Sequence, residues 1–529
     1  MARSAPLLSV ENLSIALPGV ADRTHAVADV SFSVAPGEIL CIVGESGSGK
    51  SVMSLAIMGL LSRGLAVEGG RILFEGRDLL TMPPKARRDL AGRRIAMVFQ
   101  EPIASLNPFY RVGEQVAEVF RLHTDMPKRE IRERVLELFG EVLLPEPEAI
   151  YERYPHQLSG GQCQRVMIAM ALALEPAVLI ADEPTTALDV TTQAQILDLI
   201  RDLRARHGTA IVFITHDFGV VEEIADRVAV MQSGCLVEEG TRAHIMEAPE
   251  HPYTRALLAA VPKLAPRVVE SNNAPPFLVA KGLQKRWPER DIPALDDVSL
   301  SIRPGETVGL VGESGSGKST LARAIIRLGT VDGGSIKLNG EDLVNKEGAP
   351  LRSLRRHVQM VFQDPYSALD PRQKIGSALT EGPIGYGLSR GEAYERVRDL
   401  IAAVGLQPSA LHRFPHEFSG GQRQRICIAR ALALRPDLLI ADEALSALDV
   451  TMQAQVLDLL GKMQERFGFA MLFITHDLRI ASSLCDRICV MQRGRIIEEA
   501  EPRTLFAQSQ QAYTRALLQA IPGGSRESW

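Results

Sequence analysis

Long apolar segments are lacking in this 529-residue chain. The longest apolar run, from Val166 to Ala181, is interrupted by Glu175 and Pro176, whereas a membrane-spanning helix needs about 20 apolar residues. The opening residues Met1–Ser4 lead into a mixed polar and apolar stretch without the apolar region of a secretory signal. We therefore expect a cytosolic protein with no membrane span, which reaches a membrane only through a partner.

Paired cysteines and an excess of basic residues are lacking as well. No CxxC pair occurs, so we expect reduced thiols rather than a zinc or redox site. A formal net charge of −5 argues against nucleic acid as the main ligand, because nucleic-acid binding usually leaves a basic footprint. The 46% hydrophobic and 23% charged residues are ordinary for a globular protein with large cores.

An internal duplication dominates what is present. The stretch GESGSGKS occurs at 44–51 and again at 312–319, an offset of 268. Further blocks recur in the same order: VFQEP and VFQDP at 98–102 and 361–365, SGGQ at 159–162 and 419–422, and FITHD at 213–217 and 473–477. Length alone suggests three or four domains of about 150 residues, but this repeat indicates two homologous domains.

The domain boundary is predicted from composition. Residues 263–276 carry prolines and paired polar residues without an amphipathic period, which is typical of an exposed linker. We therefore predict one domain over 1–262, a linker over 263–276 and a second domain over 277–529. Within each half, short β-rich runs alternate with helix-like stretches, which indicates an α/β sheet covered by helices. Residues 102–158 are helix-biased and predict a separate small helical lobe.

Each GESGSGKS stretch follows an apolar strand, at 39–43 or 307–311, and precedes an apolar helix, which is the setting of a phosphate-binding loop. Its glycines let the backbone wrap phosphate, and Lys50 and Lys318 should reach the β- and γ-phosphates of a nucleotide. The Ser51 and Ser319 hydroxyls should ligate Mg²⁺. The predicted nucleotide-binding residues here are Gly44, Glu45, Ser46, Gly47, Ser48, Gly49, Lys50 and Ser51, and Gly312, Glu313, Ser314, Gly315, Ser316, Gly317, Lys318, Ser319 and Thr320.

An acidic pair ends a predicted buried strand in each half. We assign Asp182 and Asp442 to the magnesium shell, and Glu183 and Glu443 to polarising the attacking water, because positioning and charge neutralisation dominate phosphoryl transfer. An isolated Asp-Glu pair is more often a partner of a helix N-terminus. The phosphate-binding loop in the same half favours catalysis here.

The combination of these motifs with SGGQ, which lies 23 residues before the acidic pair (182 − 159 and 442 − 419), resembles the ABC ATPase family. The resemblance covers nearly the whole chain and implies two P-loop domains, each with a RecA-like α/β core and a small helical lobe. It implies that the loop of one domain faces the SGGQ of the other with ATP between them. It further implies that Gln100 and Gln363 touch magnesium or water, and that His216 and His476 contact the γ-phosphate. The implied SGGQ contacts are Ser159, Gly160, Gly161, Gln162, Ser419, Gly420, Gly421 and Gln422.

In this family adenine commonly stacks on an aromatic residue just after the first strand. Trp287 fits that role in the second half, whereas Leu17 stands in the equivalent place in the first. Cys163 follows SGGQ where Arg423 stands in the second half, and Ala444 replaces Pro184 after the acidic pair. None of these departures removes a phosphate, metal or water group, so both sites are predicted to be competent.

Several longer phrases are similar to the bacterial dipeptide, oligopeptide and nickel importer ATPases: QEPIASLNP and QDPYSALDP, DVTTQAQIL and DVTMQAQVL, and HPYTRALLAAVP and QAYTRALLQAIP. Fusion into one chain resembles the ATPase of microcin-C-type peptide importers, with the fused glutathione-importer ATPase next. The resemblance implies two integral-membrane permease subunits as partners, an external substrate-binding protein indirectly, and a peripheral place on the cytoplasmic face of the inner membrane.

Other tandem ABC ATPases act on ribosomes or in DNA repair. The short proline-bearing linker argues against the ribosomal kind, which usually has a long charged helical linker, and the lack of zinc-type cysteine clusters argues against the repair kind. An isolated nucleotide-binding regulator is disfavoured by the two complete catalytic sets. A ribosomal or nucleic-acid role stays the alternative to ATP-driven closure of the two domains in a peptide importer.

Overall fold

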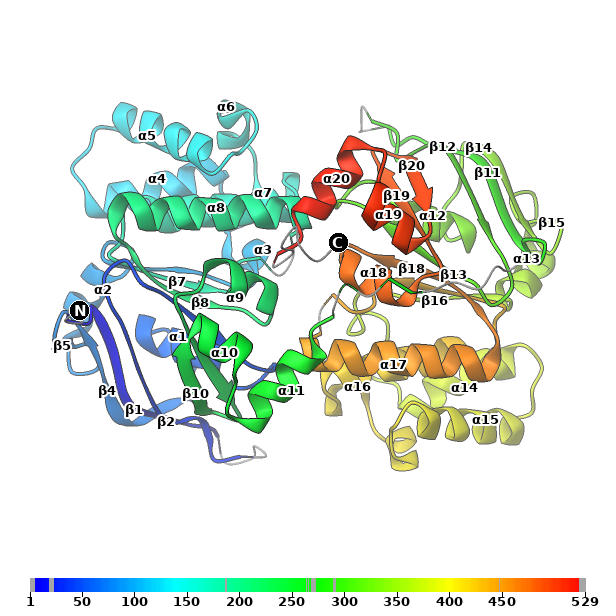
Figure 1. Cartoon of the computed structure of the whole chain (residues 1–529), viewed down its shortest axis with the longest axis horizontal. Coiled ribbons are helices and arrows are strands. Elements are labelled where there is room, and N and C mark those ends of the chain that lie inside the picture. Colours follow the sequence, from blue (N-terminus) through cyan, green and yellow to red (C-terminus); the bar gives the residue numbers. More distant parts are fainter. Residues whose placement is uncertain are drawn as a thin grey trace. The chain divides into compact units, whose positions relative to one another are not determined.

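The computed structural model describes residues 5–18, 23–185, 188–262, 264, 266–267, 273–288, 292–446 and 448–522. The chain forms two compact units, the first reaching Val261 and the second running from Pro262 to Ile521. Each unit contains a six-stranded mixed sheet, a four-stranded antiparallel sheet and a group of helices (Figure 1). The predicted α/β class is therefore confirmed. In the part of the chain that the structure describes, none of the helices combines the length and the apolar character that a bilayer span requires.

The central sheet of the first unit carries the predicted site strands. β3 pairs in parallel with β8 and β9, β7 pairs in parallel with β6 and β8, and β10 closes the edge antiparallel to β9. In spatial order the strands are β10 (Cys235–Thr241), β9 (Arg227–Gln232), β3 (Ile39–Val43), β8 (Ala210–Ile214), β7 (Val178–Asp182) and β6 (Ile95–Val98). Parallel strands place their carboxyl ends at one edge of the sheet, so the segments after β3, β7 and β8 meet there.

Both faces of this sheet are buried, which explains its uninterrupted apolar runs. Alternate residues of β7 belong to different cores: Val178 and Ile180 pack on one side, Leu179 and Ala181 on the other. The first core lies against α1 and the antiparallel sheet β2 (His25–Val34), β1 (Leu8–Ala16), β4 (Ala66–Phe74) and β5 (Arg77–Asp78). The second core contains residues of the helices between positions 112 and 260.

A small helical lobe lies beside α7 and α8 in the first unit (Figure 1). In this lobe α4 and α5 pack against α7, and α6 packs against α4 and α5, as predicted for residues 102–158. The helices of this unit are α1 (Lys50–Met58), α2 (Pro84–Leu90), α3 (Pro102–Ser105), α4 (Val112–His123), α5 (Lys128–Glu141), α6 (Pro147–Tyr151), η1 (Pro155–Gln157), α7 (Gly160–Leu172), α8 (Val190–His207), α9 (Phe218–Ile224), α10 (Arg242–Glu247) and α11 (Pro252–Ala260).

The second unit repeats this architecture. Its central sheet has the order β16 (Val358–Val361), β17 (Leu438–Asp442), β18 (Ala470–Thr475), β13 (Thr307–Val311), β19 (Arg487–Gln492) and β20 (Arg495–Ala500). Its antiparallel sheet is β12 (Leu295–Ile302), β11 (Leu278–Lys285), β14 (Gly333–Leu338) and β15 (Glu341–Asp342). The helices are α12 (Lys318–Ile325), α13 (Gly348–Arg355), α14 (Ile375–Gly385), α15 (Arg390–Ala403), η2 (Pro408–His412), η3 (Pro415–Glu417), α16 (Gly420–Leu432), α17 (Val450–Phe467), α18 (Leu478–Leu484), α19 (Pro502–Gln508) and α20 (Ala512–Gln519).

Parts of the predicted linker contact the second unit. Leu264 packs against the apolar core of that unit. The Arg267 amide donates to the Ser482 carbonyl at 3.0 Å, and its guanidinium lies 3.4 Å from Asp486. These residues are therefore held by the second unit. Residues 263, 265 and 268–272 of the predicted linker lie outside the described residues.

Candidate nucleotide-binding sites

The phosphate-binding loop of the first unit leaves β3 and enters α1 at Lys50, as the motif predicts. The Lys50 side chain folds back onto its own loop, where Nζ donates to the Gly44 carbonyl at 2.7 Å, the Glu45 carbonyl at 2.8 Å and Ser48 Oγ at 3.2 Å. Lys50 is 5% exposed. The loop thus surrounds a buried cation at a helix N-terminus, which is a favourable setting for phosphate.

Two loop glycines are required by their neighbours rather than only by a ligand. A Cβ at Gly44 would lie 2.2 Å from the Met231 carbonyl oxygen, and one at Gly49 would lie 2.4 Å from the Ala26 carbonyl oxygen. Their φ angles of +150° and +105° are also rare for residues with side chains. The loop therefore packs closely against the backbone at Met231 and at Ala26. These contacts fix its shape before any nucleotide binds.

The Asp182 carboxylate ends β7 beside the loop. Ser51 Oγ donates to Asp182 Oδ1 at 3.1 Å, so the two predicted magnesium ligands lie together. Burial raises the pKa of Asp182 to about 6, against the hydrogen bond from Ser51. Mg²⁺ prefers oxygen ligands and usually takes one or two carboxylates together with phosphate and water. This pair fits such a cation, which would stabilise the charged carboxylate.

The Glu183 side chain is the centre of a polar group in the first unit. Its carboxylate accepts a hydrogen bond from Gln100 Nε2 at 2.9 Å and lies 3.5 Å from His216 Nδ1. Burial lowers the pKa of His216, but the hydrogen bond and charge of Glu183 outweigh burial, so that the pKa is raised. The structure therefore brings three residues together that are far apart in the sequence.

The backbone of both predicted water-activating glutamates is unusual. Glu183 and Glu443 each have φ of +46°, a region that costs free energy for residues other than glycine. Their amides donate at 3.0 Å to the carbonyls of Ile214 and Ile474 on the adjoining strands. A hydrogen bond to the neighbouring strand therefore holds each glutamate in this conformation.

The second unit reproduces most of these contacts. Lys318 Nζ donates to the Gly312 and Glu313 carbonyls at 2.8 and 2.9 Å, and Ser319 Oγ donates to Asp442 Oδ1 at 3.1 Å. Gln363 Nε2 donates to Glu443 at 2.8 Å, and Lys318 Nζ lies 3.9 Å from the same carboxylate. Burial raises the pKa of Asp442. His476 directly follows β18, whereas His216 is the second residue after β8, and Thr320 lies in the first turn of α12.

Both SGGQ segments form helix caps. Ser159 Oγ accepts from the Gln162 amide at 3.2 Å, while Gln162 Oε1 accepts from the Ser159 amide at 3.0 Å. Ser419 and Gln422 repeat this pair at 3.4 and 3.1 Å. The two glycines then occupy the first turn of α7 or α16, where backbone amides lack intrahelical partners. Each segment therefore offers an anion-binding helix N-terminus.

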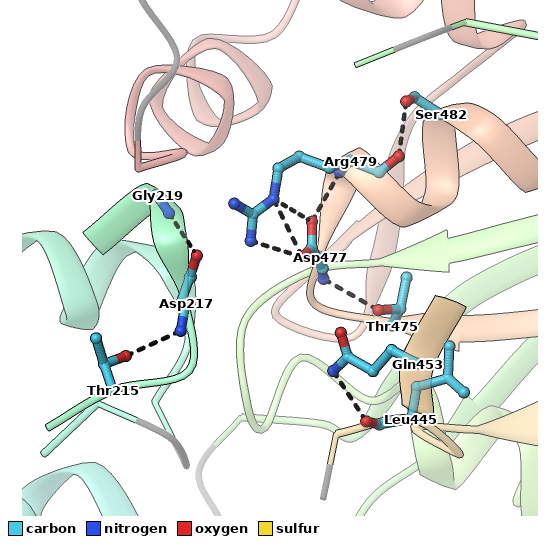
Figure 2. A network of polar contacts seen from close by, with 9 residues as sticks. All are labelled: Thr215, Asp217, Gly219, Leu445, Gln453, Thr475, Asp477, Arg479 and Ser482. Carbon is cyan, nitrogen blue, oxygen red and sulfur yellow. Dashed lines mark hydrogen bonds and ion pairs between the residues drawn. The ribbon is translucent and has the colours of Figure 1, made fainter. Parts of the chain in front are cut away.

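The residue after each predicted histidine organises the following turn (Figure 2). The Asp217 amide donates to Thr215 Oγ1 at 3.0 Å, and its carboxylate accepts from the Gly219 amide at 2.9 Å. Asp477 makes the same turn with Thr475 and Arg479, and also accepts a hydrogen bond from Arg479 Nη2 at 2.8 Å (Figure 2). Each aspartate thereby positions the chain directly after the predicted histidine.

The two units differ at a pair of positions that are in contact in the second unit. In the second unit the Arg423 guanidinium lies 4.0 Å from the centroid of the Tyr366 ring. In the first unit the equivalent residues are Cys163, which is fully buried, and Ile103. The first unit therefore has apolar residues at both positions where the second unit forms a cation–π contact.

Trp287 and Leu17 occupy equivalent positions after the first strand of each unit, because both lie nine residues beyond a strand start (Leu8 or Leu278) with the same sheet partners. The Trp287 side chain is 44% exposed, and Lys285 Nζ lies 5.0 Å from its ring centroid. The exposed part of the indole is available for stacking on a purine. Leu17 offers no π-face.

We expect the second site to bind ATP more tightly than the first, by about 0.5–1.5 kcal/mol if stacking is the only difference. ATP titrations of the Lys50→Ala and Lys318→Ala variants each report the other site. Leu17→Tyr should narrow the gap, and Trp287→Leu should remove it. Equal affinities of the two sites in the otherwise unchanged chain would contradict the assignment of Trp287.

The structure adds two residues that the motifs did not single out. Tyr253 Oη accepts a hydrogen bond from the Glu45 amide at 3.0 Å, and Tyr513 Oη accepts one from the Glu313 amide at 3.1 Å. Both tyrosines lie in the repeated YTRALL phrase, whose recurrence was the only signal in the sequence. Tyr253 lies 208 residues after Glu45 in the sequence, and Tyr513 lies 200 residues after Glu313.

Comparisons with known proteins find relatives of this chain. A family model described as ABC transporter matches residues 27–186 and 295–446, and one described as oligopeptide/dipeptide transporter, C-terminal region, matches residues 237–277. The chain is 48% identical to the glutathione import ATP-binding protein GsiA of Escherichia coli strain K12, over 98% of this chain and 89% of that protein. It is 46% identical to GsiA of Pectobacterium atrosepticum with the same coverage. A solved structure of cbiO1 from Clostridium perfringens covers 44% of this chain and 92% of its own, at 27% identity and a TM-score of 0.41.

Proposed function

Because this chain belongs to the ABC transporter family of ATP-binding proteins, we propose that it is the ATP-hydrolysing subunit that drives a bacterial importer of peptides, including glutathione-like peptides. The observation that carries this proposal is the complete set of lysine, Ser–Asp pair, glutamate and glutamine in both units. The match to the oligopeptide/dipeptide transporter C-terminal region supports peptides as the cargo class.

The residues support the following division of labour. The lysines and loop amides hold the ATP phosphates, and the Ser51–Asp182 and Ser319–Asp442 pairs hold Mg²⁺. Glu183 and Glu443 orient the attacking water, while the histidines and the first-turn amides of the SGGQ helices stabilise charge on the γ-phosphate. ATP binding and hydrolysis then drive closure and opening of the two domains.

Coupling to membrane subunits is assigned to the surface that follows Gln100 and Gln363. Gln100 bonds to Glu183 on one side and leads directly into α3 of the helical lobe on the other. Ile103, Phe109 and Tyr110 are 61%, 84% and 60% exposed there, and Tyr366 is 59% exposed in the second unit. Exposed apolar side chains gathered beside a catalytic glutamine fit a docking surface for a permease subunit at the cytoplasmic face of the membrane.

Phe109→Asp and Tyr366→Asp together should lower peptide uptake by cells at least about tenfold and leave the ATPase activity of the purified chain within about twofold. The physical reason is that a charge at each exposed apolar position opposes docking, while both substitutions leave every residue assigned to ATP in place. Uptake of labelled glutathione and tripeptides, with ATP hydrolysis measured in parallel, provides the test. Leu122→Asp, at a 72% exposed position elsewhere on the first lobe, is the control.

Wild-type uptake by the double variant would place the coupling surface elsewhere. The importer proposal itself fails if the wild-type chain never co-purifies with a detergent-solubilised membrane complex. Co-sedimentation with ribosomes would instead favour the alternative role of a tandem ABC ATPase.

A further inference from the structure

The first peptide of each phosphate-binding loop is held from both ends. The Gly44 carbonyl accepts from Lys50 Nζ at 2.7 Å, and the amide of the same peptide, that of Glu45, donates to Tyr253 Oη at 3.0 Å. In the second unit the Gly312 carbonyl accepts from Lys318 at 2.8 Å, and the Glu313 amide donates to Tyr513 at 3.1 Å. A trans peptide points its N–H and C=O in opposite directions. The tyrosine and the lysine therefore form hydrogen bonds on opposite sides of the same peptide group.

The residue that precedes this peptide group is a glycine in both units. Gly44 and Gly312 cannot be replaced by larger residues, because a Cβ on either would lie 2.2 Å from a backbone carbonyl oxygen. Glycine places little steric restriction on rotation of the adjoining peptide. The two hydrogen bonds therefore add to the backbone contacts that seat this glycine, and they hold the adjoining peptide in one orientation.

The tyrosine hydroxyl is delivered by a rigidly anchored helix. Glu238 on β10 accepts from the amides of Glu250 at 2.7 Å and His251 at 3.2 Å, directly before α11. His251 Nδ1 then accepts from the Tyr253 amide at 3.2 Å. The helix start is thus fixed to the edge strand of the central sheet, and Tyr253 lies one turn from that anchor.

The second unit contains the same anchor with different residues. Glu498 on β20 accepts from the amides of Gln510 at 2.7 Å and Gln511 at 3.2 Å, directly before α20. Glutamine therefore replaces His251 while the tyrosine contact persists. A cavity of about 440 Å³ lies beside this loop, lined by Glu313, Gly315 and Tyr513 among others.

We propose that Tyr253 and Tyr513 are positioning residues for ATP binding. Each hydroxyl holds the first loop peptide with its carbonyl toward the lysine, so that the loop amides and the ammonium group are arranged for phosphate before ATP arrives. The C-terminal helix of each unit thereby stabilises the phosphate-binding loop of that unit. The proposal rests on the ATPase function and goes beyond it in assigning a role to the helices that carry the tyrosines.

Tyr253→Phe combined with Tyr513→Phe tests this proposal, because each change removes one hydroxyl and keeps the ring. A neutral hydrogen bond contributes a few-fold in an equilibrium constant, so KM for ATP should rise about fivefold while kcat stays within about twofold. ATP affinity measured without Mg²⁺ should fall by a similar factor. Tyr394→Phe is the matched control, because its hydroxyl lies 3.4 Å from His412 in the helical lobe, and it should leave both constants unchanged.

A KM change below twofold in the double variant overturns the proposal. An equal loss of kcat, together with a lowered melting temperature, also overturns it, because that result describes a structural role only. These outcomes are distinct from failure of the proposed function, which would appear as absent ATP hydrolysis in the wild-type chain.

Discussion

ATP turnover should fall at least about 100-fold when Glu183 and Glu443 are both replaced by glutamine, while ATP affinity stays within about threefold. Glutamine keeps the size and one hydrogen-bonding oxygen but cannot polarise a water by accepting its proton, a contribution typically worth 10²–10⁴ in rate. The hydrogen bonds of the lysines to their loops and of the serines to the aspartates are made without these carboxylates, so binding is retained. Release of phosphate at saturating ATP measures turnover, and retention of labelled ATP on the purified chain measures binding.

Glu175→Gln is a matched control for this experiment. Glu175 is also a glutamate with a left-handed backbone, with φ of +51°, but its carboxylate pairs with His207 at 3.3 Å at the surface. Its replacement should leave turnover unchanged. Wild-type turnover in the Glu183→Gln, Glu443→Gln chain would remove both residues from the catalytic role, and a loss of ATP binding would show that they act on the nucleotide site as a whole.

Lys50→Met with Lys318→Met should weaken ATP binding at least about 100-fold. Each lysine is 5% exposed, and its ammonium is the charge held inside the loop. Charge-assisted hydrogen bonds to phosphate are roughly twice as strong as neutral ones, and two phosphates share this cation. Methionine fills the space of the aliphatic stem, which limits the change in packing.

Isothermal titration with ATP and Mg²⁺ measures the loss. Lys462→Met is the control for removal of a positive charge, because Lys462 is a surface residue whose side chain is 65% exposed. It should bind ATP like the wild type. Unaltered ATP affinity in the double lysine variant, with a melting temperature close to that of the wild type, would contradict the assignment of the phosphate-binding loops.

Much of the site could be predicted because its parts are local in sequence. The loop needs a glycine-rich turn between a strand and a helix, and both copies of GESGSGKS lie in that setting. Because of the duplication, each motif could be recognised in two copies. The fixed distance from SGGQ to the acidic pair then distinguished ABC ATPases from other P-loop families. The family expectation is confirmed, although the relatives compared above carry the glutathione-import name that was ranked second to microcin-C-type importers.

Other parts could not be predicted because they depend on long-range contacts. The left-handed backbone of Glu183 is held by a hydrogen bond to the Ile214 carbonyl of the next strand. The Asp-Glu pair itself does not predict this conformation. The Ser159 hydroxyl was expected to face phosphate, whereas the structure also gives it the role of helix cap. The roles of the predicted site residues stay predictions until the variants above are measured.

Sequence alone was enough to identify two ABC ATPase units and to predict which residues bind phosphate, metal and water, because short motifs encode backbone shape and charge within a few residues. The fold was needed to reveal that Tyr253 and Tyr513 reach back to the start of each loop. A hydrogen bond between residues about 200 positions apart exists only after the edge strand has brought the C-terminal helix beside β3 or β13. The contacts that orient the site therefore arise from sheet topology, which no local pattern contains.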